Sequence, residues 1–280
     1  FTQGMVTHQT FQNYKNEWIS PDEIIYNKES ITDHQGNKVK IGKIEKMSKS
    51  KKNIVDPSEI IETYGADTAR WFMLSDSPPE RDLEWTENGI ASSHKFINKV
   101  WDLLNEFLSE NYLKKNSNDN EALKEKIDST IQNVTENIDN FHYNKSVANL
   151  YELVNLIQKI ISKGSVSNTC LLDAFKKLSL LLQPFTPHLS EGMWEKLGTK
   201  DLAINQTWPK HSGIQRKKTS KIAVQINGKT KEILEFNIGI DKEKVKIKAL
   251  NSKKIIKMIN GKVIKKTIFV PEKILNIVLK

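Results

Sequence analysis

Apolar residues recur at helical spacing through the middle of the chain, and this pattern constrains the fold most strongly. Over residues 88–113 it is carried by Ile90, Phe96, Ile97, Val100, Trp101, Leu104, Phe107 and Leu108. It continues over residues 121–139, 144–162, 168–183 and 187–197, with breaks at Gly164 and Pro184 and a polar loop expected at 115–120. Helices with one apolar side bury that side against each other, so the sequence predicts an antiparallel helical bundle.

The period of the pattern changes after residue 220. Residues 221–226 alternate between the two faces of a strand, Asn227-Gly228 is a favoured hairpin turn, and residues 229–236 return as a second strand. One or two helices are expected over 241–258, followed by strands at 264–270 and 274–279. We therefore predict a small α+β domain in which helices cover one side of a sheet.

A lysine-rich segment, residues 43–57, shows neither the helical nor the strand spacing of apolar residues. Its sequence, KIEKMSKSKKNIVDP, places Lys46, Lys49, Lys51 and Lys52 close to two serines. Lysines on an adaptable loop are mobile point charges, and hydroxyl and backbone N–H groups add hydrogen bonds, so the segment suits phosphate binding. The alternative for a lysine run is a solvated basic loop.

Short elements are expected on both sides of this segment. Residues 24–26 suggest a strand, and the turn signal at 33–37 suggests a hairpin that leads into the lysines. Asp56-Pro57 is a helix start, and that helix should end at Gly65. A second helix should run from Asp67 through residue 73, and Arg70 on it is a candidate contact to RNA or a partner in a salt bridge.

The pentapeptide Lys46-Met47-Ser48-Lys49-Ser50, followed by Asn53, Asp56-Pro57 and residues 64–67, resembles the second signature of class I aminoacyl-tRNA synthetases. Further stretches are similar to leucyl-tRNA synthetases, at residues 2–6, 70–74, 78–80, 82–85 and 224–229. The resemblance implies a C-terminal portion of such an enzyme, mainly α and with several domains. It implies the end of a Rossmann-like catalytic domain at 1–85, an anticodon-binding-type bundle at 86–200, a linker at 201–220 and a tRNA-binding α+β domain at 221–280.

This resemblance also implies a chemistry. The intact enzyme would be a leucine–tRNA ligase that activates leucine with ATP and Mg²⁺ and transfers it to tRNA(Leu). The residues carried over as ATP-binding are Lys46, Met47, Ser48, Lys49 and Ser50, with Lys46 and Lys49 stabilising the pyrophosphate leaving group. The His-Gly first signature is not found, and His8 and His34 lie in other contexts, so residues 1–280 alone are expected to be inactive.

Charge is concentrated at one end of the sequence. Residues 216–280 hold 18 Lys and Arg against 5 Asp and Glu, whereas the whole chain has a net charge of +9. Such an excess is typical of nucleic-acid binding, although a solubilising surface is the alternative. The expected RNA contacts are Arg216, Lys217, Lys218, Lys229, Lys231, Lys262, Lys265 and Lys266.

Composition limits the remaining possibilities. No run approaches 18 apolar residues, so a membrane span is not expected. The single cysteine, Cys170, excludes an internal disulfide and a cysteine-rich zinc site, and no residue is predicted to bind a metal. We expect a cytoplasmic monomer. The alternatives are a valyl or isoleucyl enzyme, a non-catalytic tRNA-binding module, or a scaffolding bundle.

Overall fold

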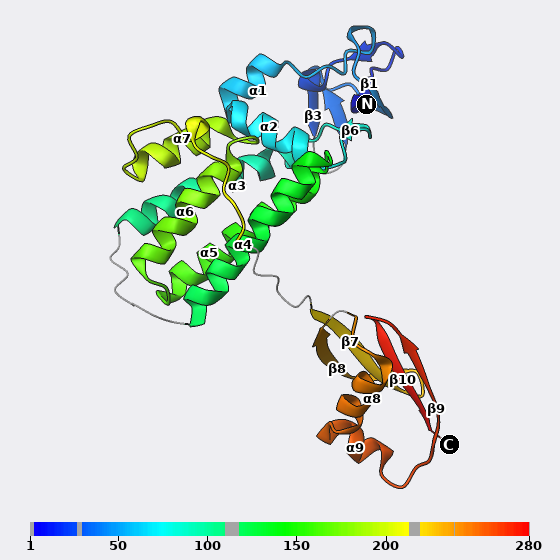
Figure 1. Cartoon of the computed structure of the whole chain (residues 1–280). Coiled ribbons are helices and arrows are strands. Elements are labelled where there is room, and N and C mark those ends of the chain that lie inside the picture. Colours follow the sequence, from blue (N-terminus) through cyan, green and yellow to red (C-terminus); the bar gives the residue numbers. More distant parts are fainter. Residues whose placement is uncertain (1–2, 27–29, 110–117, 213–218, 238, 280) are drawn as a thin grey trace. The chain divides into compact units, whose positions relative to one another are not determined.

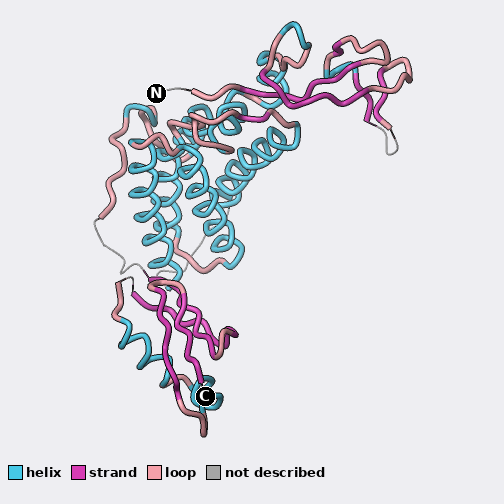
Figure 2. The backbone as a smooth tube through the Cα atoms, turned by 90° about the vertical axis from the view of Figure 1, so that its right-hand side faces the viewer, coloured by secondary structure: helices cyan, strands magenta, loops and turns pink. Residues whose placement is uncertain are grey.

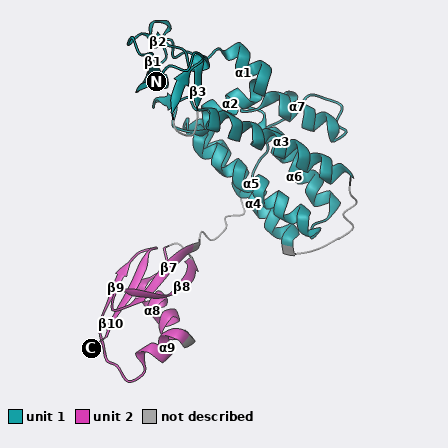
Figure 3. Ribbon diagram, turned by 180° about the vertical axis from the view of Figure 1, so that it is seen from behind, with its two compact units in different colours: residues 1–212 teal, residues 213–280 magenta. Residues whose placement is uncertain are grey.

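The computed structural model describes residues 3–26, 30–109, 118–212, 219–237 and 239–279 (Figure 1). The chain divides into two compact units, unit 1 at residues 1–212 and unit 2 at residues 213–280 (Figure 3). Arg216, Lys217 and Lys218, which we predicted to contact RNA, lie outside the described residues. None of the helices in the described ranges is both long enough and apolar enough to cross a membrane.

Unit 1 begins with a small sheet in the strand order β2-β1-β5, and β6 pairs with β1. The strands are β1 (Val6–Gln12), β2 (Trp18–Ile19), β5 (Lys40–Lys46) and β6 (Leu83–Glu84). β1 is antiparallel to β2 and β5 and parallel to β6. A separate hairpin joins β3 (Ile24–Tyr26) to β4 (Ile31–Asp33), which confirms the strand predicted at 24–26.

The structure corrects the expected start of the lysine loop. Residues 43–46 belong to β5, where Lys46 pairs with Thr7, so the loop starts at Met47. Alternation of apolar side chains gave no sign of this strand, because Ile41 and Ile44 are three positions apart and so lie on opposite faces. Backbone hydrogen bonds to β1 hold the strand, and these bonds leave no trace in the sequence pattern.

Two short helices follow the lysine segment, as predicted. The Asp56 side chain accepts a hydrogen bond of 2.8 Å from the Ser58 N–H and caps α1 (Pro57–Tyr64). Gly65, at φ 85°, ends α1 and precedes α2 (Ala66–Ser75). A positive φ favours glycine because it has no Cβ atom.

The bundle predicted from the helical spacing is formed by long helices that lie side by side (Figures 1 and 2). They are α3 (Glu87–Ser109), α4 (Asn118–Asp139), α5 (Tyr143–Lys163), α6 (Asn168–Leu182) and α7 (Pro187–Lys196). The first three residues of α4, 118–120, lie within the loop predicted at 115–120, so the helix starts earlier than predicted. Gly164 adopts a left-handed conformation and ends α5, as expected.

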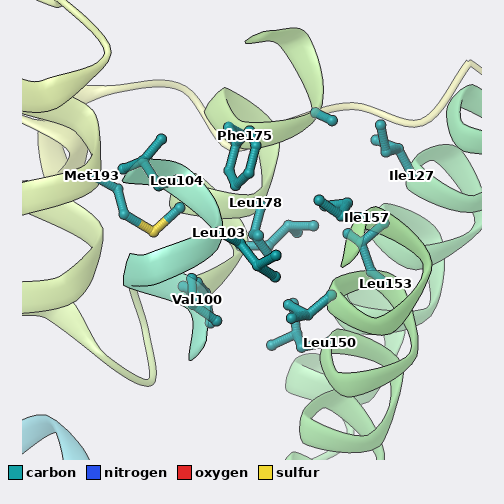
Figure 4. Close-up of a cluster of buried hydrophobic side chains, with 14 of the residues drawn as sticks. Val100, Leu103, Leu104, Ile127, Leu150, Leu153, Ile157, Phe175, Leu178 and Met193 are labelled. Atoms are coloured by element: carbon teal, nitrogen blue, oxygen red, sulfur yellow. The ribbon is translucent and has the colours of Figure 1, made fainter. Parts of the chain in front are cut away.

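Side chains from these helices form one buried apolar core, part of which is drawn in Figure 4. The labelled members include Leu104 of α3, Ile127 of α4, Leu153 of α5, Phe175 of α6 and Met193 of α7, all at most 1% exposed. Trp71 of α2 belongs to the same core and stacks on Phe96 at a ring-centroid distance of 4.4 Å. α2, the second helix after the lysine loop, is therefore packed onto the bundle.

Unit 2 is the small α+β domain predicted after residue 220. Its sheet has the strand order β8-β7-β10-β9, in which β7 is antiparallel to β8 and parallel to β10. Its elements are β7 (Thr219–Ile226), β8 (Lys229–Asn237), α8 (Lys242–Leu250), α9 (Lys253–Ile259), β9 (Ile264–Val270) and β10 (Ile274–Leu279). The core contains Ile222 and Leu275 of the sheet with Val245 and Ile255 of the helices, so one face of the sheet is covered.

Candidate functional site

The lysine loop connects the end of β5 to α1. Met47 donates its backbone N–H to the Val6 oxygen at 3.1 Å, which extends the pairing with β1 by one residue. The Met47 side chain packs on a core formed by Ile60, Phe72 and neighbouring residues. Of the residues predicted to bind ATP, Met47 thus directs its side chain into the protein, and this packing fixes one end of the loop.

The lysines of the loop fall into two groups. Lys51 forms an ion pair with Glu45, and its Nζ lies 5.9 Å from the centroid of the Trp18 ring. Lys46, Lys49 and Lys52 are exposed, and none of them forms an ion pair with a described residue. The structure therefore has three exposed positive charges in this segment, Lys46 at the end of β5 and Lys49 and Lys52 on the loop.

The two serines lie on the same stretch as these charges. Ser48 precedes a 3-10 turn over Lys49–Lys51, and its hydroxyl is 3.3 Å from the Ser50 hydroxyl. Lys52 ends the turn in a left-handed conformation, at φ 53°. Ser50 is exposed and Ser48 is half-buried, so at least the Ser50 hydroxyl is accessible to a bound anion.

Asn53, which belongs to the stretch that resembles the signature, makes contacts that the sequence did not predict. Its side chain is 1% exposed and its Oδ1 accepts the Ser48 N–H at 2.9 Å. The Nδ2 group donates to backbone oxygens of β1 and β5. A buried asparagine in a polar loop has no periodic signal, because its partners are set by how the loop folds back on the sheet.

His8 lies on β1 beneath the loop. Its Nδ1 donates to the Asn53 backbone oxygen at 3.2 Å. Burial lowers the pKa of His8 below its ordinary value of 6.5, and the Asn53 carbonyl and the charges of Glu87 and Glu84 oppose that shift. The lowered pKa favours the neutral form of His8, which holds the loop through its hydrogen bond to Asn53.

Arg70 forms no salt bridge with a described residue, and its contact to RNA stays a prediction. Its Nε donates to the Phe185 oxygen at 3.0 Å and its Nη2 to the Pro184 oxygen at 2.7 Å. These carbonyls follow the C-terminal end of α6, where backbone oxygens lack helical partners. Arg70 thus joins α2 to the corner between α6 and α7.

In unit 2, the strand directions place the predicted RNA-contact lysines at one end of the sheet. β7 and β10 run in parallel, so the turn after β7 lies beside the end of β10 and the start of β9. The Asn227 Oδ1 in that turn accepts the Leu279 N–H at 2.8 Å. The lysines at this end, here called the sheet-end lysines, are all exposed: Lys229, Lys231, Lys262, Lys265 and Lys266.

The sheet-end lysines span the width of the sheet. β8 and β9 are its outer strands and are separated by β7 and β10. Neighbouring strands lie about 4.8 Å apart, so three spacings place the backbones of β8 and β9, and the Cα atoms of their lysines, about 14 Å apart. The described residues contain no group of three or more His, Cys, Asp or Glu side chains that could hold a metal ion.

Comparison with known proteins agrees with this geometry. The family profile described as class I tRNA synthetases (I, L, M and V) matches residues 7–86, which include the lysine loop. The leucine–tRNA ligase of Rickettsia bellii (strain RML369-C) is 41% identical over 280 residues, 99% of this chain. The chain is similar to leucyl-tRNA synthetases along nearly its whole length. The leucine–tRNA ligase of Rhizorhabdus wittichii is 40% identical over 99% of this chain.

The chain spans about a third of the length of these two relatives, 33% and 32% respectively. Among solved structures, the agnB2 LeuRS of Agrobacterium radiobacter K84, in a ternary complex with tRNA and LeuAMS, aligns with a TM-score of 0.67. It is 23% identical, and the alignment covers all of this chain and 33% of that one. This likeness shows a shared fold.

A second profile, described as the anticodon-binding domain of tRNA ligase, matches residues 119–247. The match begins in α4 and ends in α8, whereas we predicted the bundle domain at 86–200. The chain thus combines a class I catalytic-type fold with an anticodon-binding domain. The exact domain boundaries at 85, 200 and 220 stay predictions.

Proposed function

We propose that these residues are part of a leucine–tRNA ligase, and that they supply phosphate stabilisation and tRNA docking. The observation that carries the proposal is that Lys46, at the end of β5, and Lys49 and Lys52, on the loop, are exposed and have no ion-pair partner among the described residues. It is supported by similarity to leucine–tRNA ligases along nearly the whole chain. The proposed substrates are leucine, ATP and tRNA(Leu).

In the proposed reaction, the leucine carboxylate attacks the α-phosphate of ATP and pyrophosphate leaves. Negative charge grows on the leaving group, and the ammonium groups of Lys46 and Lys49 stabilise it. Ser50, exposed beside them, is placed to donate a hydrogen bond to a phosphate oxygen. Magnesium accompanies ATP in such reactions and is held largely by the phosphates themselves.

The second part of the proposal concerns tRNA. The sheet-end lysines are exposed and lie together at one end of the unit 2 sheet. Such an arrangement neutralises backbone phosphates without reading bases. A monomeric cytoplasmic enzyme remains our expectation for the complete protein.

The test is leucine-dependent exchange of pyrophosphate into ATP by the complete protein that contains these residues. The wild type should exchange with leucine and not with valine or isoleucine. Lys49→Ala should lower the exchange rate by about 100-fold, the usual cost of removing a group that stabilises developing charge. Lys43→Ala, which removes an exposed lysine from β5, is the matched control and should change little.

Binding of tRNA provides an independent readout. Lys49→Ala should bind leucine tRNA as the wild type does, whereas deletion of residues 216–280 should weaken that binding. Exchange that survives the Lys49 change would contradict the leaving-group role. Equal binding of leucine, valine and isoleucine tRNAs would assign specificity to parts of the protein beyond this chain and leave unit 2 as a source of charge alone.

A further inference from the structure

The loop that carries Lys49 is closed by a side chain. Asn53 Oδ1 accepts the Ser48 N–H at 2.9 Å, so this hydrogen bond joins the two ends of residues 48–53. Lys49–Lys51 form the 3-10 turn inside this ring. The position of Lys49 therefore depends on the closure made by Asn53.

The same side chain ties the ring to the sheet. Asn53 Nδ2 donates to the His8 oxygen of β1 at 3.1 Å and to the Glu45 oxygen of β5 at 3.2 Å. It also lies 3.4 Å from the Lys46 oxygen. The Asn53 backbone oxygen accepts from His8 in return. One side chain thus joins the loop to both strands that support it.

Only an amide of this length fits these partners. Asparagine has a carbonyl that accepts and an NH₂ group that donates twice. An aspartate would direct a second negative oxygen at the backbone oxygens of His8 and Glu45. An alanine would leave the Ser48 N–H and these oxygens without their partner in a site where Asn53 is 1% exposed.

We infer that Asn53 is a positioning residue that holds Lys49 in place for the phosphate of a bound nucleotide. The functional half of this inference rests on the proposed adenylate-forming activity, whereas the closure itself does not. A charge that must meet a developing negative charge acts best when it is already in place. The effect of Asn53 on the reaction should therefore pass through Lys49.

Closure is tested directly in the 280-residue chain by hydrogen exchange at the Ser48 amide. The amide should exchange slowly in the wild type and much faster in Asn53→Ala. Trypsin should also cleave after Lys49 and Lys52 sooner in this variant. Asn133→Ala, which removes a single exposed side-chain bond to Asn149 in the bundle, is the matched control and should leave both readouts unchanged. A Ser48 amide that exchanges equally fast in wild type and variant would overturn the inference.

The catalytic role is tested by pyrophosphate exchange in the complete protein. Asn53→Ala should lower kcat on the order of 10- to 100-fold, with a smaller change in the KM for ATP. In a Lys49→Ala background, Asn53→Ala should cost little more, because the two residues act as one unit. If the two losses multiply instead, Asn53 does not act through Lys49.

A second variant and two outcomes distinguish failure of the Asn53 inference from failure of the proposed leucine–tRNA ligase function. If Asn53→Ala does not fold, Asn53→Asp, which keeps the size of the side chain, is measured instead and should show the same loss of kcat. A wild type without leucine-dependent exchange would contradict the proposed function and leave the closure result standing. An active wild type whose Asn53 variants keep full kcat would overturn the inference alone.

Discussion

The carboxylate of Asp67 accepts the backbone N–H of Leu189 at 2.6 Å, although the two residues are 122 positions apart. The second Asp67 oxygen accepts the His188 N–H at 3.3 Å. Both N–H groups lie in the first turn of α7, where they lack helical partners and where a negative charge suits the helix dipole. Asp67, which lies on α2, therefore caps the N-terminal end of α7.

Replacing Asp67 by alanine should destabilise unit 1. The change leaves two N–H groups at a buried helix end without an acceptor, at a cost of about 2 to 3 kcal/mol in the free energy of unfolding. Asp67→Asn keeps an acceptor and should cost about 1 kcal/mol. Urea unfolding of the 280-residue chain measures both values.

The control for this prediction is Asp173→Ala, which removes an exposed carboxylate paired with Lys177 on the surface of α6. A surface pair of this kind contributes about 0.3 to 0.5 kcal/mol. Equal losses for Asp67→Ala and Asp173→Ala would show that the cap contributes no more than a surface ion pair.

Arg70→Lys should weaken the junction between α2 and the α6–α7 corner despite keeping the positive charge. The guanidinium reaches the Pro184 and Phe185 oxygens with two separate nitrogens, and a lysine ammonium cannot reproduce that fork. We expect a loss of about 1 kcal/mol in the free energy of unfolding. A lysine variant as stable as the wild type would mean that charge alone holds the corner.

His8 should make the stability of unit 1 depend on pH. Because burial lowers its pKa in the folded protein, the unfolded chain binds the proton more readily. The contribution of neutral His8 is then complete above pH 6.5 and is lost as the pH falls below that value toward the folded pKa.

Urea unfolding of wild type and His8→Gln at neutral and mildly acidic pH measures this effect. The wild type should lose more stability than His8→Gln as the pH falls. His34→Gln, at an exposed position after β4, serves as the comparison and should follow the wild type. Parallel pH curves for wild type and His8→Gln would contradict the prediction.

The sheet-end lysines should dominate the salt dependence of tRNA binding. The triple change Lys229→Gln, Lys265→Gln and Lys266→Gln removes three of these charges, and the slope of log affinity against log salt should fall by about 2 to 3. The control is the change of three exposed lysines of α8 and α9, Lys242, Lys244 and Lys254, to glutamine. Equal slopes for the two triple variants would show that net charge matters and its location does not.

Features set by local chain geometry were predicted well from the sequence. The helical spacing predicted α3 to α7, the alternation after residue 220 predicted the strands of unit 2, and Asp56 and Gly164 marked helix ends. The lysine segment was found by its composition and by its resemblance to a signature. The strands of the first sheet, β1, β2, β5 and β6, were missed. In β5 the period is hidden because Ile41 and Ile44 are three positions apart and lie on opposite faces.

The contacts that hold the site in place were decided by the tertiary structure. Asn53 meets His8 across 45 residues, Arg70 meets Phe185 across 115 and Asp67 meets Leu189 across 122. A local pattern fixes which face of an element is apolar, because that follows from the geometry of helix and strand. The partner of a single polar side chain depends on which elements pack together. The sequence alone therefore determined the helices, the strands of unit 2 and the lysine segment, whereas packing determined the first sheet and the contacts that position the loop.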